Sequence, residues 1–252
     1  YRGYRAGPRR GLQASLMSDR KGGGVLFSEM TPPDGAEDHF NNWYNNHHMP
    51  SHVYGVPGFR SGQRYKVPDR PDYLAIYDLE SPETLTDDEY VNRKYKPDAP
   101  TKKMLSEVIA FTRYIGDEIG FQVREGVSVD DALDAPLVLG VFIELPDDAA
   151  DEFVDWYQTE HTPMLLESSL WRMVRHMKIV DADPNPFTHM FIHYIEREDA
   201  LNSEELAAAR ATEWRNRLAE NDWFKTHPVM YHRHGKRYHK GEPEAATFTL
   251  DI

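Results

Sequence analysis

Two stretches of the sequence decide the fold, FNNWYNNHHMP at residues 40–50 and FVDWYQTEHTP at residues 153–163. They read as two copies of one phrase, because five positions agree at a constant offset of 113 residues. The matched pairs are Phe40 and Phe153, Trp43 and Trp156, Tyr44 and Tyr157, His48 and His161, and Pro50 and Pro163. Three of the five shared residues are aromatic, so chance agreement is improbable, and we infer an internal repeat.

The segments around the two copies agree as well. Before them stand GVLFSEM (24–30) and LGVFIEL (139–145), short apolar and β-branched runs that are typical of strands. After each copy an aromatic residue and an arginine open an alternating segment, Phe59-Arg60 in one half and Trp171-Arg172 in the other. A strand-like run, a helix-like stretch (82–95 and 199–220) and a closing β-rich run complete each half. Both halves therefore have the order β-α-β-β-α-β of a ferredoxin-like unit.

This order predicts an α+β protein made of two tandem ferredoxin-like units, at residues 24–115 and 135–238. The polar, acidic residues 116–134 are predicted to connect them. Two open sheets in one chain can cover each other's exposed face, so we expect a pseudo-dimeric α+β barrel with the helices outside. Residues 1–23 are interpreted as a leader or disordered arm, and residues 239–252 as a tail.

The first copy and its continuation carry a family resemblance. An aromatic-rich helix, the motif His-x-Pro at residues 48–50 and the run VPGFRSGQRY at residues 56–65 resemble the EthD-like branch of the dimeric α+β barrel superfamily. The second half keeps WYxxEHTP but has SSLW in place of VPGF. The resemblance implies a fold whose relatives include decarboxylases, dehydratases, cyclases, cofactor-free oxygenases, isomerases and haem enzymes. It therefore does not select the reaction.

The composition narrows the partners. The 252 residues include 40% hydrophobic and 28% charged residues, which are values of a globular protein. A formal net charge of −13 argues against nucleic acid or an anionic membrane as partner, since either binds a basic face. No apolar run is long enough for a membrane span. The chain has no cysteine, which excludes disulfides and fits a reducing cytoplasm.

The repeated phrase supplies the first candidate site. Tyr44 lies four residues before His48 on the same helical face, so the pair could act as donor and base around a carbonyl group. Asn46, His47 and His52 have no counterpart in the second copy, which points to specialised chemistry in the first half. Asn46 and His47, with His161, are predicted to bind substrate. The alternative is structural: a histidine repeated in both halves could stabilise the C-terminus of its helix, and the aromatic rings could fill the core.

The strands supply a second candidate cluster. Leu139, Val141, Ile143 and Leu145 form a uniformly apolar face that is expected under the helices, so Glu144 points the other way. The polar aromatic residues of the third strands are assigned to this second, non-helix face. The predicted catalytic residues there are Glu144, His189 and His193, and the predicted substrate-binding residues are Arg60, Tyr65, Tyr73, Tyr77, Arg172 and His176. The alternative is a polar, hydrogen-bonded interface between the sheets.

We predict a cofactor-independent acid/base enzyme of the lyase type, acting on an aromatic or polyketide-like small molecule by dehydration, decarboxylation, retro-aldol cleavage or cyclisation. Arg60 or Arg172 would hold an anionic group. His232 and His234 share a strand face, but no third ligand is evident, so no metal is predicted. The expected partner is a small hydrophobic or aromatic substrate, and the sequence leaves a homodimer open. Two alternatives stay open: a non-catalytic binding or accessory protein, and a haem- or metal-dependent oxidoreductase.

Overall fold

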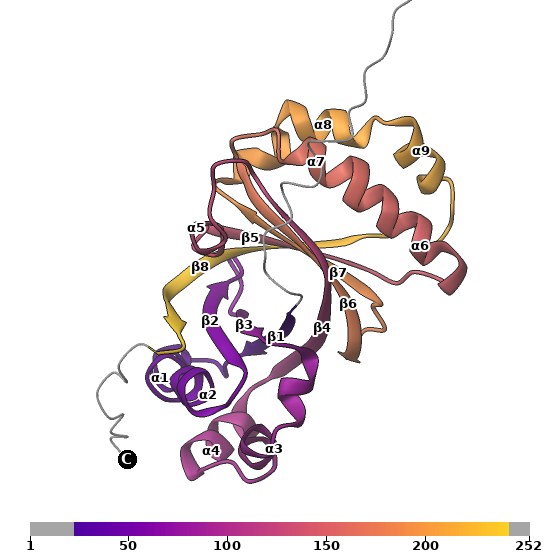
Figure 1. The fold of residues 1–252 in the computed structure, drawn as a ribbon. Helices are drawn as coiled ribbons and strands as arrows, with labels where there is room; N and C mark the ends of the chain where they lie inside the picture. Colours follow the sequence, from indigo (N-terminus) through magenta and orange to yellow (C-terminus); the bar gives the residue numbers. More distant parts are fainter. Residues whose placement is uncertain (1–22, 242–252) are drawn as a thin grey trace, which may run out of the picture.

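The computed structural model describes residues 23–241, and their strands close into one barrel (Figure 1). The first half contains β1 (Gly24–Thr31), α1 (Glu37–Trp43), the π-helical turn η2 (Tyr44–His48), α2 (Met49–Gly55), β2 (Phe59–Lys66), β3 (Tyr73–Leu79), the 3-10 helix η3 (Pro82–Thr86), α3 (Asp88–Tyr95), α4 (Ala99–Glu107) and β4 (Ala110–Val123). The short helix α5 (Val129–Leu133) follows. The second half contains β5 (Leu137–Ile143), α6 (Asp147–Trp156), the π-helical turn η4 (Tyr157–His161), α7 (Thr162–Leu165), β6 (Trp171–Asp183), β7 (His189–Ile195), the 3-10 helix η5 (Glu198–Asn202), α8 (Glu204–Arg210), α9 (Glu213–Ala219) and β8 (His227–His239).

The strand order around the barrel is β1-β3-β2-β8-β5-β7-β6-β4, and all the pairings are antiparallel. Each half contributes four neighbouring strands in the same relative order, with its first and third strands in the middle. The halves join where β2 pairs with β8 and β4 pairs with β6. Closure leaves no strand edge without a partner, which is the usual solution for two open sheets. The predicted α+β, pseudo-dimeric barrel is confirmed.

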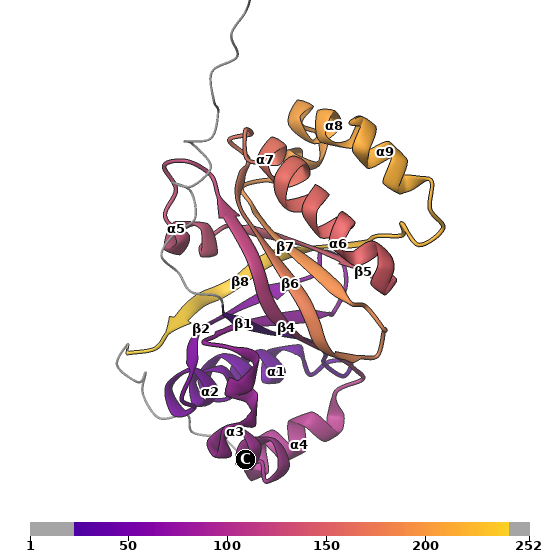
Figure 2. The ribbon, with the colours of Figure 1, turned by 45° about the vertical axis from the view of Figure 1, so that its right-hand side comes forward.

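The helices lie outside the barrel in two separate groups. In Figures 1 and 2, α1–α4 cover the strands of the first half at the lower side, and α6–α9 cover those of the second half at the upper side. Each group packs through an apolar stripe, because the phrase places aromatic residues three and four positions apart on its helix. The aromatic residues at these positions are Phe40, Trp43 and Tyr44 in one half, and Phe153, Trp156 and Tyr157 in the other; all of them are buried.

Three buried clusters follow from this layering. One cluster fills the barrel interior and includes Met173, Met177, Met190 and Ile192. The other two lie between the strands and the helices, one in each half. A ligand site between sheet and helices is therefore separated from the barrel interior by the sheet itself.

The boundary of the predicted connector needs correction, and most of the predicted leader and tail lies outside the described residues. Residues 116–123 of the predicted connector belong to β4, because this strand must be long enough to pair with β1 through one part and with β6 through the other. The helix α4 was not predicted as a separate element. The predicted leader lies outside the described residues except for Gly23, and so does the predicted tail beyond Gly241.

Candidate functional site

The repeated phrase forms the same unusual helix in both halves. In the first half the backbone N–H of Met49 bonds to the carbonyl of Tyr44, five residues back, and Thr162 bonds to Tyr157 in the same way. Such π turns are rare and occur frequently at functional sites. The proline that ends each phrase gives a physical reason. Its ring would collide with the carbonyl four residues earlier in a regular α-helix, and the wider turn relieves that collision.

The π turn stacks the repeated histidine against the tryptophan and tyrosine before it. In the first half the ring centroid of His48 lies 4.5 Å from that of Trp43 and 4.9 Å from that of Tyr44. In the second half both corresponding distances from His161 are 4.8 Å. The structural alternative of a histidine at a helix C-terminus is wrong, because the helix continues to Gly55 in one half and through α7 in the other.

The histidines of β7 lie on the helix side of the sheet, which corrects the predicted face. His193 stands opposite Leu139 in the β5–β7 pairing, and directly paired residues point to the same side. The counterpart Tyr77 stands opposite Leu26, a member of the helix-side cluster. Alternation separates two faces but does not say which one meets the helices. Here His193 and Tyr77 belong to the helix-side layers, while other aromatic rings, such as Phe27 and Phe142, pack with methionines and aliphatic side chains inside the barrel.

The larger candidate site is a cavity of about 480 Å³ between the sheet and the helices of the first half. Its inner wall brings together Tyr44, His48, His52 and Tyr77, and apolar walls come from residues such as Leu26, Met30 and Leu105. Charged groups from α3, β4 and β6 also line it: Arg93, Lys94, Arg113, Asp181 and Asp183. The first-choice pair of the sequence, Tyr44 and His48, is therefore brought into one cavity.

His52 has a defined protonation state. Its Nδ1 lies 2.8 Å from the backbone carbonyl oxygen of His48, and a carbonyl only accepts hydrogen bonds, so Nδ1 carries the proton. The lone pair is consequently on Nε2. Burial lowers the pKa of His52 to about 4, against a small opposing effect of this backbone bond. The ring is thus neutral at pH 7 and has one basic nitrogen.

His48 is neutral as well. Burial, followed by the neighbouring rings of His52 and His47, lowers its pKa well below the ordinary value. Its Nδ1 is buried without a hydrogen-bond partner. The ring of His52 lies 4.5 Å away, measured between centroids. Two neutral imidazoles therefore lie together at the wall of one cavity, which is the state that a general base needs before it takes a proton.

Tyr44 and Tyr77 provide the complementary donors. Their hydroxyl oxygens lie 3.3 Å apart, and burial raises the pKa of both groups. Both phenols therefore stay protonated at neutral pH, and one of the two can donate to a ligand while it accepts from the other. The guanidinium carbon of Arg64 lies 4.4 Å from the centre of the Tyr44 ring and adds positive potential on that side.

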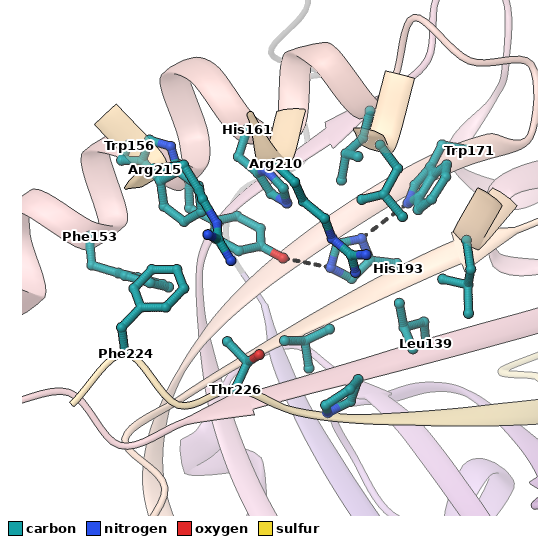
Figure 3. A pocket seen from close by; sticks show the side chains of 16 residues that line it. Leu139, Phe153, Trp156, His161, Trp171, His193, Arg210, Arg215, Phe224 and Thr226 are labelled. Carbon is teal, nitrogen blue, oxygen red and sulfur yellow. Dashed lines mark hydrogen bonds between the residues drawn. The ribbon is translucent and has the colours of Figure 1, made fainter. Parts of the chain in front are cut away.

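A second, smaller cavity of about 230 Å³ lies at the equivalent place in the second half. Figure 3 shows His161, His193 and the tryptophans around it, with Arg210 and Arg215 reaching in from the helices. The hydroxyl of Tyr157 lies 2.7 Å from Nε2 of His193, and Nε1 of Trp171 lies 3.1 Å from Nδ1 of the same ring. The side chain of His161 bonds to the backbone of Ala209.

The remaining predicted residues do not join either cavity. Asn46 is exposed and bonds to Asn42, and Nε2 of His47 lies 2.6 Å from the carboxylate of Asp98. Both point away from the cavity because they occupy the outer side of the helix. Arg60 is half-buried at the start of β2.

The predicted grouping of Glu144 with Arg172 and the strand histidines is wrong. Glu144 is exposed just beyond the end of β5, and Arg172 forms a two-bond ion pair with Glu196 at 2.6 and 2.7 Å. His176 and His189 lie on the helix side, with ring centroids 5.6 Å apart.

The predicted tyrosines are also divided between different layers. Tyr65 is buried inside the barrel, in the cluster that also holds the methionines. The hydroxyl of Tyr73 bonds to Glu37 and accepts from Asn41. Only Tyr77 lines the first-half cavity. The three tyrosines therefore do not form one substrate-binding surface.

The structure adds residues that the sequence prediction did not include in the site. His52 breaks the repeat but is not among the predicted site residues, although its spacing of four positions from His48 places it on the same helical face. Arg93, Arg113, Arg210 and Arg215 come from other helices and strands, and no local motif marks them. Among residues 23–241 no group of three His, Asp or Glu side chains is placed to hold a metal ion. In the same part of the chain no helix is long and apolar enough to cross a membrane.

Comparison with known proteins identifies the fold. No family model and no curated protein matches the chain. An anthrone oxidase-like protein of known structure superimposes with a TM-score of 0.67 and 11% identity, covering 93% of this chain and 100% of its own. A protein assigned as a monooxygenase from Lactobacillus acidophilus has a TM-score of 0.58 and 10% identity, covering 88% of this chain and 98% of its own. A chlorite dismutase variant from Candidatus Nitrospira defluvii has a TM-score of 0.54 and 9% identity, covering 88% of this chain and 94% of its own. These similarities show the barrel fold, and the EthD-like branch stays a prediction.

Proposed function

We propose that the protein is a cofactor-independent acid/base enzyme that acts on an aromatic or polyketide-like compound. It removes a proton from a carbon whose anion is conjugated with the carbonyl group of that compound. One observation carries the proposal. Two neutral imidazoles, His48 and His52, line a cavity of about 480 Å³ together with the paired hydroxyls of Tyr44 and Tyr77. A base beside a hydrogen-bond donor is the arrangement that proton abstraction next to a carbonyl requires.

The residues divide the work as follows. Tyr44 donates its hydroxyl hydrogen to the carbonyl oxygen of the substrate. His48 or His52 accepts the proton from carbon through its lone pair, and the electron pair of the broken C–H bond moves to the carbonyl oxygen. The resulting enolate is stabilised by the Tyr44 hydrogen bond and by the positive charge of Arg93, because both groups line the same cavity.

The first half is the better catalytic half. The position equivalent to His52 is Leu165, so the second cavity has only one histidine from the phrase. His161 is bonded to the backbone of Ala209, and the second cavity has about half the volume of the first. Both halves therefore share the repeated scaffold, and only the first half combines the two histidines His48 and His52.

The fate of the enolate defines the reaction. Loss of water or carbon dioxide, retro-aldol cleavage or ring closure would make the protein a lyase or cyclase. The similarity to an anthrone oxidase-like protein supports anthrone as a test compound. Loss of a proton from the CH₂ group of anthrone gives an anion that is conjugated with the carbonyl group. Proton removal is common to all these fates, so it is the step to test first.

The test is hydrogen–deuterium exchange in D₂O, followed by NMR, on anthrone, 1-tetralone and a β-diketone. We expect exchange faster than in buffer for at least one compound. His48→Gln and His52→Gln should reduce the enzymatic rate by about 10²-fold or more. His161→Gln is the matched control, because it changes the equivalent residue of the other half, and it should leave the rate within about twofold. No exchange with any compound would favour the accessory role, and an equal loss in the control would remove the first-half base from the mechanism.

Haem is a second candidate, because haem enzymes are among the relatives that the family resemblance implies. The cavity of the second half does not fit it well. The second-half cavity, about 230 Å³, is smaller than the roughly 300–1,000 Å³ that drug-sized ligands occupy, and a porphyrin is larger than most such ligands. Both nitrogens of His193 are engaged by Trp171 and Tyr157. A Soret band that shifts on titration of hemin into the protein, and that His48→Gln or His161→Gln abolishes, would support the haem alternative.

A further inference from the structure

We propose that the cavity of the second half binds a small aromatic carboxylate, and that it is a binding site separate from the acid/base site of the first half. The proposal does not depend on the reaction assigned to the first half. It rests on the charge of the cavity, on the direction of its hydrogen bonds and on its aromatic walls.

The charge of the cavity is positive in a strongly acidic chain. Arg210 and Arg215 line the cavity, and its lining includes no aspartate or glutamate, although the whole chain has a net charge of −13. Among the described residues neither arginine forms an ion pair; the guanidinium carbon of Arg215 lies 5.2 Å from the centre of the Phe224 ring. Arg217 on the same helix is different, because it lies 2.6 Å from the carboxylate of Glu152. Two guanidinium groups at one cavity favour an anion, and the planar donor fork of a guanidinium group matches the two oxygens of a carboxylate.

The hydrogen bonds inside the cavity have a fixed direction. The indole Nε1–H of Trp171 can only donate, so Nδ1 of His193 is the acceptor and the neutral ring carries its proton on Nε2. That proton is donated to the hydroxyl oxygen of Tyr157. The hydroxyl hydrogen of Tyr157 is then left to donate elsewhere, and Tyr157 lines the cavity. The chain from Trp171 through His193 thus makes Tyr157 a donor toward a ligand.

The neutrality of His193 agrees with this direction. Burial lowers its pKa to about 3, so the ring stays neutral at any pH where the protein would work. Burial also raises the pKa of Tyr157, which keeps the phenol protonated. The first half has tyrosine at the position of His193, so this fixed donor chain is found in the second half and not in the first.

The walls and the volume define the size of the ligand. Phe153, Trp156, Trp171 and Phe224 line the cavity, and rings of this kind bind flat aromatic molecules. The volume of about 230 Å³ is below that of typical drug-sized sites, so one ring or two fused rings fit. The carboxylate would face Arg210, Arg215 and Tyr157, and the rings would pack against the tryptophans.

Isothermal titration calorimetry with 2-naphthoate and its neutral analogue 2-naphthamide tests the proposal. We expect naphthoate to bind at least about tenfold more tightly than the amide. Arg210→Gln, Arg215→Gln and Tyr157→Phe should each weaken naphthoate binding by about tenfold. Arg217→Gln is the matched control on α9, and His48→Gln is the control for the other cavity; neither should change the affinity. Thermal melting of each variant verifies that it is folded.

Several results would overturn the proposal. The first is no heat of binding with naphthoate at millimolar concentration, and the second is equal affinity for acid and amide. A loss in Arg217→Gln equal to that in Arg210→Gln would show a general charge effect and no defined site. A loss in His48→Gln without a loss in the arginine variants would place the ligand in the first-half cavity. Deuterium exchange by the arginine variants separates this outcome from failure of the proposed reaction.

Discussion

Replacing Arg175 by methionine should strongly destabilise the barrel, because it removes the guanidinium group that two buried carboxylates share. Arg175 lies in β6 and is fully buried; its Nη2 is 2.9 Å from Oδ1 of Asp78 in β3, and its Nε is 2.5 Å from Oε2 of Glu118 in β4. The arginine comes from the second half and both acids come from the first. The cluster therefore joins the two halves through the barrel interior.

The expected magnitude follows from the burial. Breaking a buried ion pair by removing one partner costs about 3–5 kcal/mol, because the remaining buried charge loses the compensation of that partner. For a chain of this size that loss corresponds to a melting temperature lower by about 6–20 °C. The triple variant Arg175→Met, Asp78→Asn, Glu118→Gln removes all three charges. It should recover more than half of the loss, since most of the penalty comes from the negative charges that stay buried after the guanidinium group is removed.

Urea denaturation followed by tryptophan fluorescence and by far-UV circular dichroism measures both variants at pH 7. The two probes must give coincident transitions before a free energy of unfolding is assigned. A loss below about 1 kcal/mol in Arg175→Met would refute the reasoning, because a value that small is typical of exposed pairs. A triple variant no more stable than the single variant would refute it too, since the cost would then come from packing.

Three further predictions concern stability. Asp98→Ala should lower the free energy of unfolding in urea by about 1 kcal/mol, because the Asp98 side chain caps α4. His47→Ala removes the surface contact with Asp98 and keeps the cap, so it should lower this free energy by less than about 0.5 kcal/mol. Gly116→Ala should lower the free energy of unfolding by about 1–3 kcal/mol, since its Cβ would lie 2.7 Å from the Cβ of Met177 in β6. Gly120→Ala should lower it by less, because the added Cβ meets the end of the flexible Gln158 side chain. Burial lowers the pKa of His189 to about 4, so the unfolded chain, with a pKa near ~6.5, binds the proton more readily. Stability is therefore full above pH ~6.5 and falls toward pH 4, and His189→Asn should flatten the fall of the urea midpoint between pH 7 and 5.

Much of the fold could be predicted from the sequence, because the evidence for it is periodic and repeated. The two copies of the phrase fix the order of the elements, and alternating apolar residues mark β1 and β5 as strands. The boundary between the halves was harder. Residues 116–123 contain two glycines and two acidic residues, but Ile119, Phe121 and Val123 stand at every second position, which is the period of a strand. This short local signal was outweighed by the acidic composition of the whole segment 116–134, and the pairing with β6 that completes the strand is not encoded locally.

The candidate site was only partly predictable, for two physical reasons. Alternation along a strand has a period of two and identifies two faces, but only the packed helices decide which face is which. The prediction that His193 and Tyr77 lie on the same face of their strands was therefore correct. The prediction that this face points away from the helices was wrong. The charged groups of both cavities come from α3, α8, α9 and the strands, so their convergence depends on the tertiary fold. The proximity of Tyr44 and His48, by contrast, followed from their spacing on one helix.

The two halves share one scaffold, but different residues surround the equivalent cavities. Both place a tyrosine and a histidine of the phrase on a π turn, with nearly the same ring distances. They differ in what surrounds this pair. In the first half, His52 adds a second nitrogen with a free lone pair, so the cavity can take a proton. In the second half, leucine replaces that histidine, and two arginines with an oriented tyrosine leave mainly donors and positive charge. A cavity of that kind favours an anion, as we propose for the second half. The repeat therefore explains the shared helix, and the residues that break the repeat explain why the two cavities should bind different states of a ligand.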